Sequence, residues 1–164
     1  MIINVTKITD RALLDEAASF TSGKECGAIP LHKWYDAEHS PIRTQVFFVR
    51  MYAIPTFVSV HFVRHKVGVD HFVRSNREDR GGVTHADRGT PVNHAMFLNA
   101  QALIAMARKR LCGKASKETQ KVFGLIKQQI ELCDPDLALA LVPECEYRGR
   151  CTEFKSCGRY KNKE

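Results

Sequence analysis

A dense group of basic side chains lies between residues 64 and 80, and only three acidic residues interrupt it. Its cations are Arg64, Lys66, Arg74, Arg77 and Arg80. Arginine grips phosphate through paired hydrogen bonds, and Ser75 adds a hydroxyl donor within the same segment. The segment therefore predicts a phosphate-binding edge. A basic helix end followed by a solvated charged loop is the alternative.

Two pairs of polar side chains have helical spacing. His61 and His65 lie four residues apart, so they project from one side of a helix that ends in the basic group. Asn99 and Arg110 are eleven residues apart. On one helix this is about three turns, or roughly 16 Å, which matches the length of a nucleotide. Arg110 also follows two other cations, and such a triplet equally suits the last turn of a helix, where the dipole favours positive charge.

The six cysteines are expected to be free thiols, because nothing in the sequence indicates an oxidising compartment. Three of them, Cys145, Cys151 and Cys157, recur at every sixth residue. This is not the spacing of a zinc knuckle, and we expect no metal. A three-thiolate site completed by Cys133 or a histidine is the minor alternative. The sequence also lacks the glycine-rich loops of Rossmann and P-loop nucleotide sites.

Length and charge narrow the possible functions. The chain has 164 residues, which corresponds to one domain, and a formal net charge of +7. The positive charge predicts an anionic partner, either nucleic acid or phosphorylated small molecules. No apolar run approaches the roughly 18 residues that span a bilayer, and no signal peptide is recognisable. We therefore expect a cytoplasmic protein without a membrane partner.

Strands and helices alternate along the chain, which indicates an α/β or α+β fold. Asp10 is a typical N-cap for the first helix, Pro55 suits the first turn of a helix, and Pro135 lies just past the end of another. The expected strands are residues 2–8, 43–53 and 70–75. The expected helices are residues 11–19, 55–66, 95–111 and 116–134. Residues 20–40 are expected to form a loop with some helix, and residues 143–164 a basic tail that carries cysteines after a domain of residues 1–142.

Several segments resemble the flavin-dependent thymidylate synthases. Arg64-His65-Lys66 is similar to the Arg-His-Arg motif that ends a helix in this family. Residues 16–20 resemble its Ala-Ala-Arg-x-Ser segment, and residues 99–103 resemble its Asn-Ala-Arg-Ser-Leu helix, with Arg110 following. The likeness covers most of residues 1–140. Against the family pattern, the third motif residue is lysine, Ser75 comes one position late, the glutamate before it is missing, and the middle region is short.

The resemblance implies a single α/β domain with a central, mostly antiparallel sheet flanked by helices, assembled as a homotetramer. Such enzymes bind FAD and a nucleotide between subunits. They make dTMP from dUMP, with methylenetetrahydrofolate as carbon donor and NADPH as reductant. The short chain suits the compact members that viruses carry, which would act in the host cytoplasm. We therefore expect dUMP, or a related pyrimidine nucleotide, as the substrate.

The same resemblance assigns roles to residues by position. The nucleotide would be bound by His61, Arg64, Ser75, Arg77 and Arg110. The flavin would be bound by His39, Arg64, His65, Lys66 and Asn99. Arg64, His61 and Ser75 would act in catalysis, where fixed cations stabilise negative charge on the pyrimidine ring. The alternative is a binding protein that keeps the fold and its basic groove, without flavin chemistry, for nucleic acid.

Overall fold

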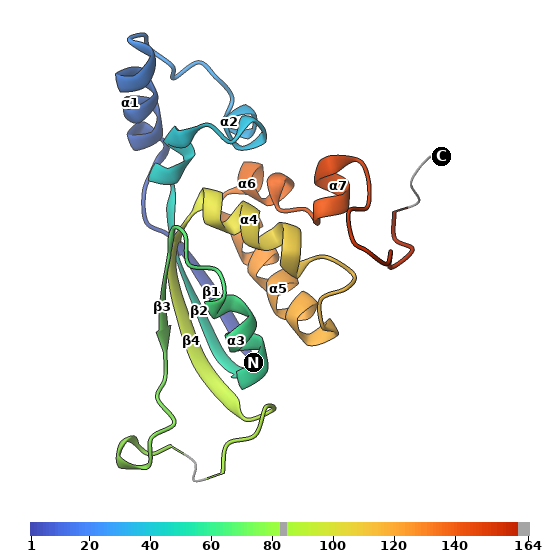
Figure 1. Cartoon of the computed structure of the whole chain (residues 1–164). Coiled ribbons are helices and arrows are strands. Elements are labelled where there is room, and N and C mark those ends of the chain that lie inside the picture. The colour runs from blue at the N-terminus through green and yellow to red at the C-terminus, as the bar shows by residue number, and fades with distance from the viewer. Residues whose placement is uncertain (83–84, 161–164) are drawn as a thin grey trace.

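The computed structural model describes residues 1–82 and 85–160, and its centre is a four-stranded antiparallel sheet (Figure 1). The strands are β1 (Ile2–Lys7), β2 (Val46–Pro55), β3 (Val69–Val73) and β4 (Pro91–Asn99). Their order across the sheet is β1-β2-β4-β3, and every neighbouring pair is antiparallel. The expected fold class, a mostly antiparallel sheet flanked by helices, is confirmed.

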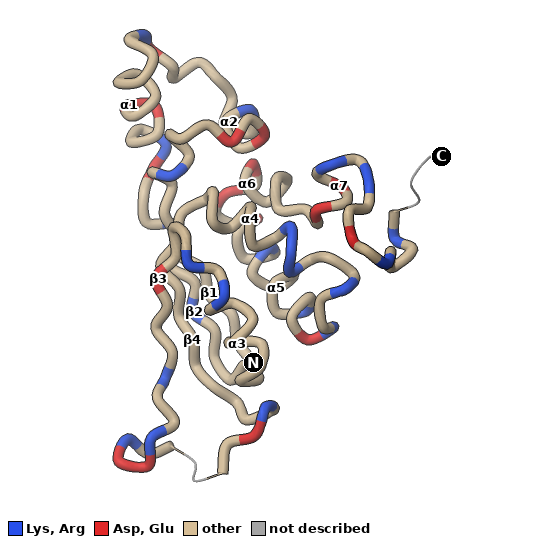
Figure 2. The backbone as a smooth tube through the Cα atoms, in the orientation of Figure 1, with Lys and Arg blue, Asp and Glu red and all other residues tan. Residues whose placement is uncertain are grey.

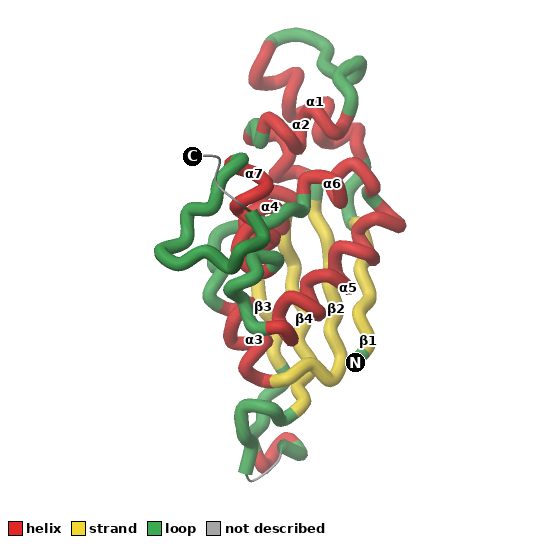
Figure 3. The backbone as a smooth tube through the Cα atoms, turned by 90° about the vertical axis from the view of Figure 1, so that its right-hand side faces the viewer, coloured by secondary structure: helices red, strands yellow, loops and turns green. Residues whose placement is uncertain are grey.

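Helices cover one face of this sheet (Figure 3). The helices are α1 (Arg11–Ser22), α2 (Leu31–Ala37), α3 (Thr56–Val63), α4 (Ala100–Arg110), α5 (Lys117–Cys133), α6 (Pro135–Ala140) and α7 (Glu144–Arg148). Figures 1 and 3 show α3, α4 and α5 on the covered face, and α1 and α2 beyond one end of the sheet. None of the helices within the described residues is long and apolar enough to cross a membrane.

Alternating side chains in β2 explain why one face is covered. Phe47, Val49 and Met51 point to the helices and are almost completely buried. Phe48 and Arg50 point to the other face, where the Arg50 guanidinium lies 4.5 Å from the centre of the Phe48 ring. A period of two places alternate residues on opposite faces of a sheet, so one strand supplies both the core and the open face.

Side-chain caps fix where the main helices begin. Asp10 accepts a hydrogen bond from the backbone of Leu13 at the start of α1, as expected from the sequence. Ser116 does the same for Thr119 at the start of α5. Each cap satisfies a backbone N–H that has no partner inside its helix. These contacts set the helix starts independently of the core.

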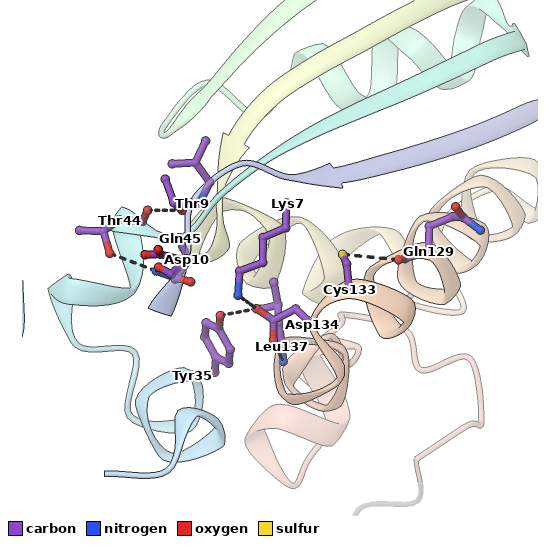
Figure 4. Close-up of polar contacts among 11 residues, drawn as sticks. Lys7, Thr9, Asp10, Tyr35, Thr44, Gln45, Gln129, Cys133, Asp134 and Leu137 are labelled. Atoms are coloured by element: carbon purple, nitrogen blue, oxygen red, sulfur yellow. Dashed lines mark hydrogen bonds and ion pairs between the residues drawn. The ribbon is translucent and has the colours of Figure 1, made fainter. Parts of the chain in front are cut away.

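A buried carboxylate ties the first strand to the helical layer (Figure 4). Asp134 accepts hydrogen bonds from Lys7 Nζ and from the Tyr35 hydroxyl, both at 2.7 Å, and from the backbone N of Leu137 at 3.0 Å. Its side chain is 1% exposed. Burial and the neighbouring Asp134 raise the pKa of Tyr35, so its hydroxyl stays a donor. Elements far apart in sequence are thereby joined at one ion pair.

Two predicted helices are wrong at their ends. Residues 95–99, predicted as the start of a helix, complete β4, because they pair with β2 on one side and β3 on the other. The helix predicted for residues 55–66 begins after Pro55, the last residue of β2, and ends at Val63. Gly68 then turns the chain into β3 with a φ of +70°, a conformation that glycine adopts without strain.

The region after residue 110 contains more structure than the sequence predicts. The predicted helix 116–134 is found as α5, and Pro135 begins a further helix, α6. Residues 144–148 of the predicted tail form α7. Arg159 forms an ion pair with Glu146 at 2.8 Å and donates to the carbonyl of Leu111 at 3.3 Å. The described part of the tail therefore packs beside the end of α4.

Candidate functional site

Arg110, the last residue of α4, joins α4 to the end of α3. Its Nε donates to Nε2 of His65 at 3.0 Å, and its Nη2 donates to the carbonyl of His61 at 2.6 Å. Three of the residues predicted for the site therefore meet in one cluster. Figure 2 shows lysine and arginine positions at the end of α4 and in the segment that follows α3.

His61 faces α5 and is surrounded by cations. Its Nδ1 lies 2.8 Å from the hydroxyl of Thr119, a residue buried in the first turn of α5. Burial lowers the pKa of His61, and so do the positive charges of Arg110, Arg64 and Arg88. All the charged groups that shift this pKa are cations. The surroundings of the His61 ring therefore carry an excess of positive charge.

His65 is held as a neutral ring. Burial lowers its pKa to about 4, and the charge of Arg110 and the ring of His71 contribute to the shift. At neutral pH its Nε2 is therefore free to accept the hydrogen bond from Arg110, which leaves the ring proton on Nδ1. The pKa of Arg110 is also lowered, by burial and by Arg64. An anion bound here would relieve this repulsion.

Arg64 and Lys66 stand on the surface beside this cluster, and both side chains are exposed. Within residues 1–82 and 85–160, neither forms a hydrogen bond through its side chain or an ion pair. Their donors are therefore available to a ligand. Arginine suits a phosphate or a planar oxyanion because its donors form a fixed fork.

A depression of about 260 Å³ adjoins Arg110 on the side of α4 that faces the tail. Lys109 and Lys114 line it, together with Cys112, Ala115 and Glu153. A larger depression, of about 340 Å³, lies on the sheet among Phe48, Phe72 and other residues. Arg74 of the predicted basic edge lines it, but none of the residues to which the resemblance assigns a role does. We place the candidate site at Arg110, because the charge of an anionic ligand would be matched there.

Ser75 and Arg77 lie elsewhere in the chain. They follow β3 in the loop that projects from the end of the sheet, away from α4 (Figure 1). The Ser75 hydroxyl accepts a hydrogen bond from the backbone of Arg77 at 3.3 Å. Arg77 forms two hydrogen bonds with the carboxylate of Asp79, at 2.9 and 2.8 Å. A single chain therefore does not bring these two residues to Arg110.

His39 and Asn99, the other two residues predicted to bind flavin, are also outside the cluster. His39 is exposed before a short 3₁₀ helix, Ser40–Thr44, and its ring meets Trp34 edge-on at 6.4 Å. Asn99 is the N-cap of α4 and accepts from the backbone of Ala102 at 2.9 Å. Asn99 and Arg110 thus stand at opposite ends of α4, with Asn99 serving as a cap.

Sequence reasoning missed a chain of histidines next to the cluster. His71 in β3 and His94 in β4 are hydrogen-bonded to each other, and His94 also contacts Ser59 in α3. His94 is 1% exposed. The available signal was the alternation of Val92, His94, Met96 and Leu98, which is typical of one strand face. That signal was obscured when residues 95–111 were predicted as one helix.

The three cysteines of the tail do not form a recognisable metal centre. Among the residues that the structure describes, no group of three or more histidine, cysteine, aspartate or glutamate side chains is arranged to hold a metal ion. Burial raises the pKa of the Cys145 thiol. Higher thiol pKa values favour the protonated form, which is a poor metal ligand. The minor alternative of a thiolate site at Cys145, Cys151 and Cys157 thus finds no support.

Comparison with known proteins identifies the fold. No protein-family model matches the sequence, and no curated protein matches it. Two solved structures of thymidylate synthase X from Helicobacter pylori, each with FAD and dUMP, superimpose with TM-scores of 0.70 and 0.66 at 12% and 11% identity. They cover 87% and 85% of this chain, and 100% and 97% of their own. The chain has the fold of a flavin-dependent thymidylate synthase.

A second kind of enzyme shares this thymidylate synthase fold. A UMP/dUMP methylase from Streptomyces cacaoi, bound to 5-bromo-dUMP, superimposes with a TM-score of 0.61 at 13% identity. It covers 85% of this chain and 94% of its own. The resemblance drawn from Arg64-His65-Lys66 is thus confirmed for the fold. At such identities the roles of individual residues stay predictions, because function depends on the site and not on the fold.

Proposed function

We propose that the chain transfers a one-carbon group from methylenetetrahydrofolate to C5 of dUMP, or of a related pyrimidine nucleotide, with FAD bound and NADPH as reductant. The observation that carries the proposal is the cluster in which Arg110 contacts the ring of His65 and the carbonyl of His61, beside the exposed side chain of Arg64. Burial lowers the pKa of the His61 ring, and so do the charges of Arg110, Arg64 and Arg88, while no carboxylate of the described residues contributes to the shift. A nucleotide phosphate or a charged pyrimidine ring would supply the missing negative charge.

Fixed cations explain how such a site would assist the reaction. C5 of uracil reacts poorly with an electrophilic carbon until negative charge spreads to the ring oxygens. In the proposal, Arg64 and Arg110 stabilise that charge, and the C5 hydrogen leaves as a proton once the new carbon–carbon bond has formed. Because Arg110 is held by His65 and His61, its guanidinium is oriented before the substrate arrives. No side chain needs to act as a covalent nucleophile.

The residues present also suit FAD. Its diphosphate needs cations without acidic partners, and Arg64 and Lys66 are exposed and form no ion pair within the described parts of the chain. We assign these two residues, with His65, to FAD, and keep His39 and Asn99 as predicted contacts. When bound, FAD supplies electron transfer between the reductant and the one-carbon unit. His65 Nδ1 is the ring donor left available, because Nε2 accepts from Arg110.

We further propose that the working enzyme is a homo-oligomer, with a tetramer as the expected state. Ser75 and Arg77 lie in a loop that projects away from the Arg110 cluster of their own chain (Figure 1). If they bind the nucleotide, they must reach the cluster of another copy. Arg77 would then exchange its contact with Asp79 for a phosphate, which is a stronger bidentate partner than an exposed carboxylate.

Replacing Arg64 by alanine tests the proposed site. The side chain is exposed, so Arg64→Ala should leave folding intact while it removes a charged hydrogen-bond donor. Charged hydrogen bonds contribute about 1.5–3 kcal/mol, which corresponds to roughly 10- to 100-fold weaker binding of dUMP or FAD. Arg150→Ala, an exposed arginine in the tail, is the matched control and should bind as the unmodified protein does.

The measurements are the visible spectrum of the purified protein, calorimetric titration with dUMP, and release of the C5 hydrogen when folate donor and NADPH are added. The expected result is a yellow protein that releases this hydrogen, and a loss of binding in Arg64→Ala alone. The proposal would be refuted, in favour of the nucleic-acid alternative, by a colourless protein that does not bind dUMP and whose affinity for nucleic acid falls steeply with salt.

A further inference from the structure

A chain of hydrogen bonds runs from α3 through two strands to the turn that carries the basic motif. Ser59 Oγ lies 3.0 Å from His94 Nδ1, and His94 Nε2 lies 3.0 Å from His71 Nδ1. His71 Nε2 lies 2.7 Å from the backbone carbonyl of His65. Ser59 and His94 are buried, at 3% and 1% exposure. The sequence assigned no role to Ser59, His71 or His94.

When both rings are neutral, the carbonyl at the end of these hydrogen bonds determines the position of every proton along them. A carbonyl oxygen only accepts, so His71 Nε2 must carry a hydrogen. In a neutral His71 ring, Nδ1 then accepts, and His94 Nε2 must donate to it. A neutral His94 in turn accepts at Nδ1 from the Ser59 hydroxyl. Burial lowers the pKa of His94 to about 4, with His71 contributing, so the His94 ring is neutral near pH 7.

The turn is held from both sides at His65. Its backbone carbonyl accepts from His71, which belongs to the sheet. Its ring accepts from Arg110, which belongs to α4. The same turn contains Gly68 and the exposed side chains of Arg64 and Lys66. The backbone N of Asn99 also donates to the carbonyl of Gly68 at 3.2 Å, so His71 supplies one of the hydrogen bonds that tie this turn to the sheet, and, among the described residues, the only one of them that reaches the backbone of the basic motif itself.

We propose that His71 is a positioning residue for the basic site, and that His94 and Ser59 hold it in the donating tautomer. His71 touches no ligand in this role. It fixes the backbone of His65, and through it the place of the Arg64 and Lys66 side chains. The part of the inference that concerns dUMP and FAD rests on the proposed function, whereas the anchoring of the turn does not.

Two substitutions of His71 separate this role from simple packing. His71→Leu fills space but gives the carbonyl no donor and leaves His94 Nε2 without an acceptor. His71→Gln keeps one amide donor for the carbonyl and one amide acceptor for His94. Losing the part-buried hydrogen bond to the His65 carbonyl should raise the population of the opened turn about tenfold. The turn should therefore open more often in His71→Leu. In His71→Gln the population of the opened turn should stay within about twofold of that in the unmodified protein.

Limited trypsin digestion of the native protein measures the opening of the turn. Trypsin cleaves after Arg64 and Lys66, and cleavage follows the population of the opened state when opening is fast. We expect cleavage at these sites to be about tenfold faster in His71→Leu, with cleavage after Arg150 unchanged. An equal rate at Lys66 in the leucine variant and the unmodified protein overturns the inference. An equal rise at Lys66 and Arg150 also overturns it, because that is general unfolding.

Calorimetric titration with dUMP separates the two proposals. If the unmodified protein binds dUMP, His71→Leu should weaken binding about tenfold and His71→Gln should restore it. Unchanged binding in His71→Leu overturns the positioning role while the proposed function stands. If no variant binds dUMP, the proposed function fails, and the trypsin contrast alone decides whether His71 anchors the turn.

A third variant and a spectroscopic measurement cover the case in which His71→Leu does not fold. Ser59→Ala removes one hydroxyl and frees His94 to move its proton to Nδ1, which breaks the contact with His71. We expect cleavage at Lys66 to rise by roughly twofold to tenfold in this variant. Nitrogen NMR of the unmodified protein should find His71 and His94 protonated on Nε2. A His94 ring protonated on Nδ1 would contradict the chain.

Discussion

Acid should destabilise this protein through His94, a residue buried between Ser59 and His71. Its pKa is about 4 in the folded chain against an ordinary value of 6.5, with burial as the main cause. As the pH falls, the unfolded chain therefore takes up the proton first. The stabilisation is complete above about pH 6.5 and is lost between about pH 6.5 and pH 4.

The size of the effect follows from the two pKa values. Between about pH 7 and pH 5, a single group with these values lowers the free energy of unfolding by about 2 kcal/mol. His94→Gln removes the titration and keeps polar atoms in the site. The pH dependence of this variant should therefore be shallower by about 2 kcal/mol over the same interval, whatever its stability at neutral pH.

Urea denaturation followed by circular dichroism, at both pH values, measures the difference. His85→Gln is the matched control, because His85 is exposed. The control should keep the full pH dependence of the unmodified protein. If His94→Gln and the unmodified protein lose the same free energy of unfolding on acidification, the ring of His94 is not held neutral by burial. The tautomer argument for the hydrogen-bond chain would then fail as well.

Two further predictions concern the scaffold. Asp134→Ala should lower the free energy of unfolding by about 3–5 kcal/mol, because it leaves the ammonium group of Lys7 part-buried without its ion pair. If urea denaturation shows a loss below about 1 kcal/mol, which is typical of an exposed ion pair, this prediction is refuted. Gly68→Ala should cost about 1–2 kcal/mol in the same assay, since φ is +70° and an added Cβ would lie 2.7 Å from Asn99 Nδ2. An unchanged free energy of unfolding would contradict this prediction and would mean that the turn shifts to accommodate the added Cβ.

Local sequence signals predicted much of the architecture, because they depend on residues close together in the chain. The N-cap at Asp10 is correct, and the helix predicted from residue 116 begins at the cap that Ser116 forms, since a cap needs only its own side chain and a backbone N–H three residues on. The β-branched and aromatic run of β2 was recognisable as a strand for a similar reason. The motif Arg64-His65-Lys66 led to the correct fold even at 11–13% identity to the solved structures.

Contacts between distant residues decided the rest. Residues 95–99 have helical spacing, yet they form a strand because β2 and β3 both pair with them, and pairing of this kind is not visible in a local window. The meeting of Arg110 with His65 and His61 spans more than forty residues of chain. The partners of His94 come from α3 and β3. Burial then shifted the pKa values of these rings, and burial is a property of the packed molecule alone.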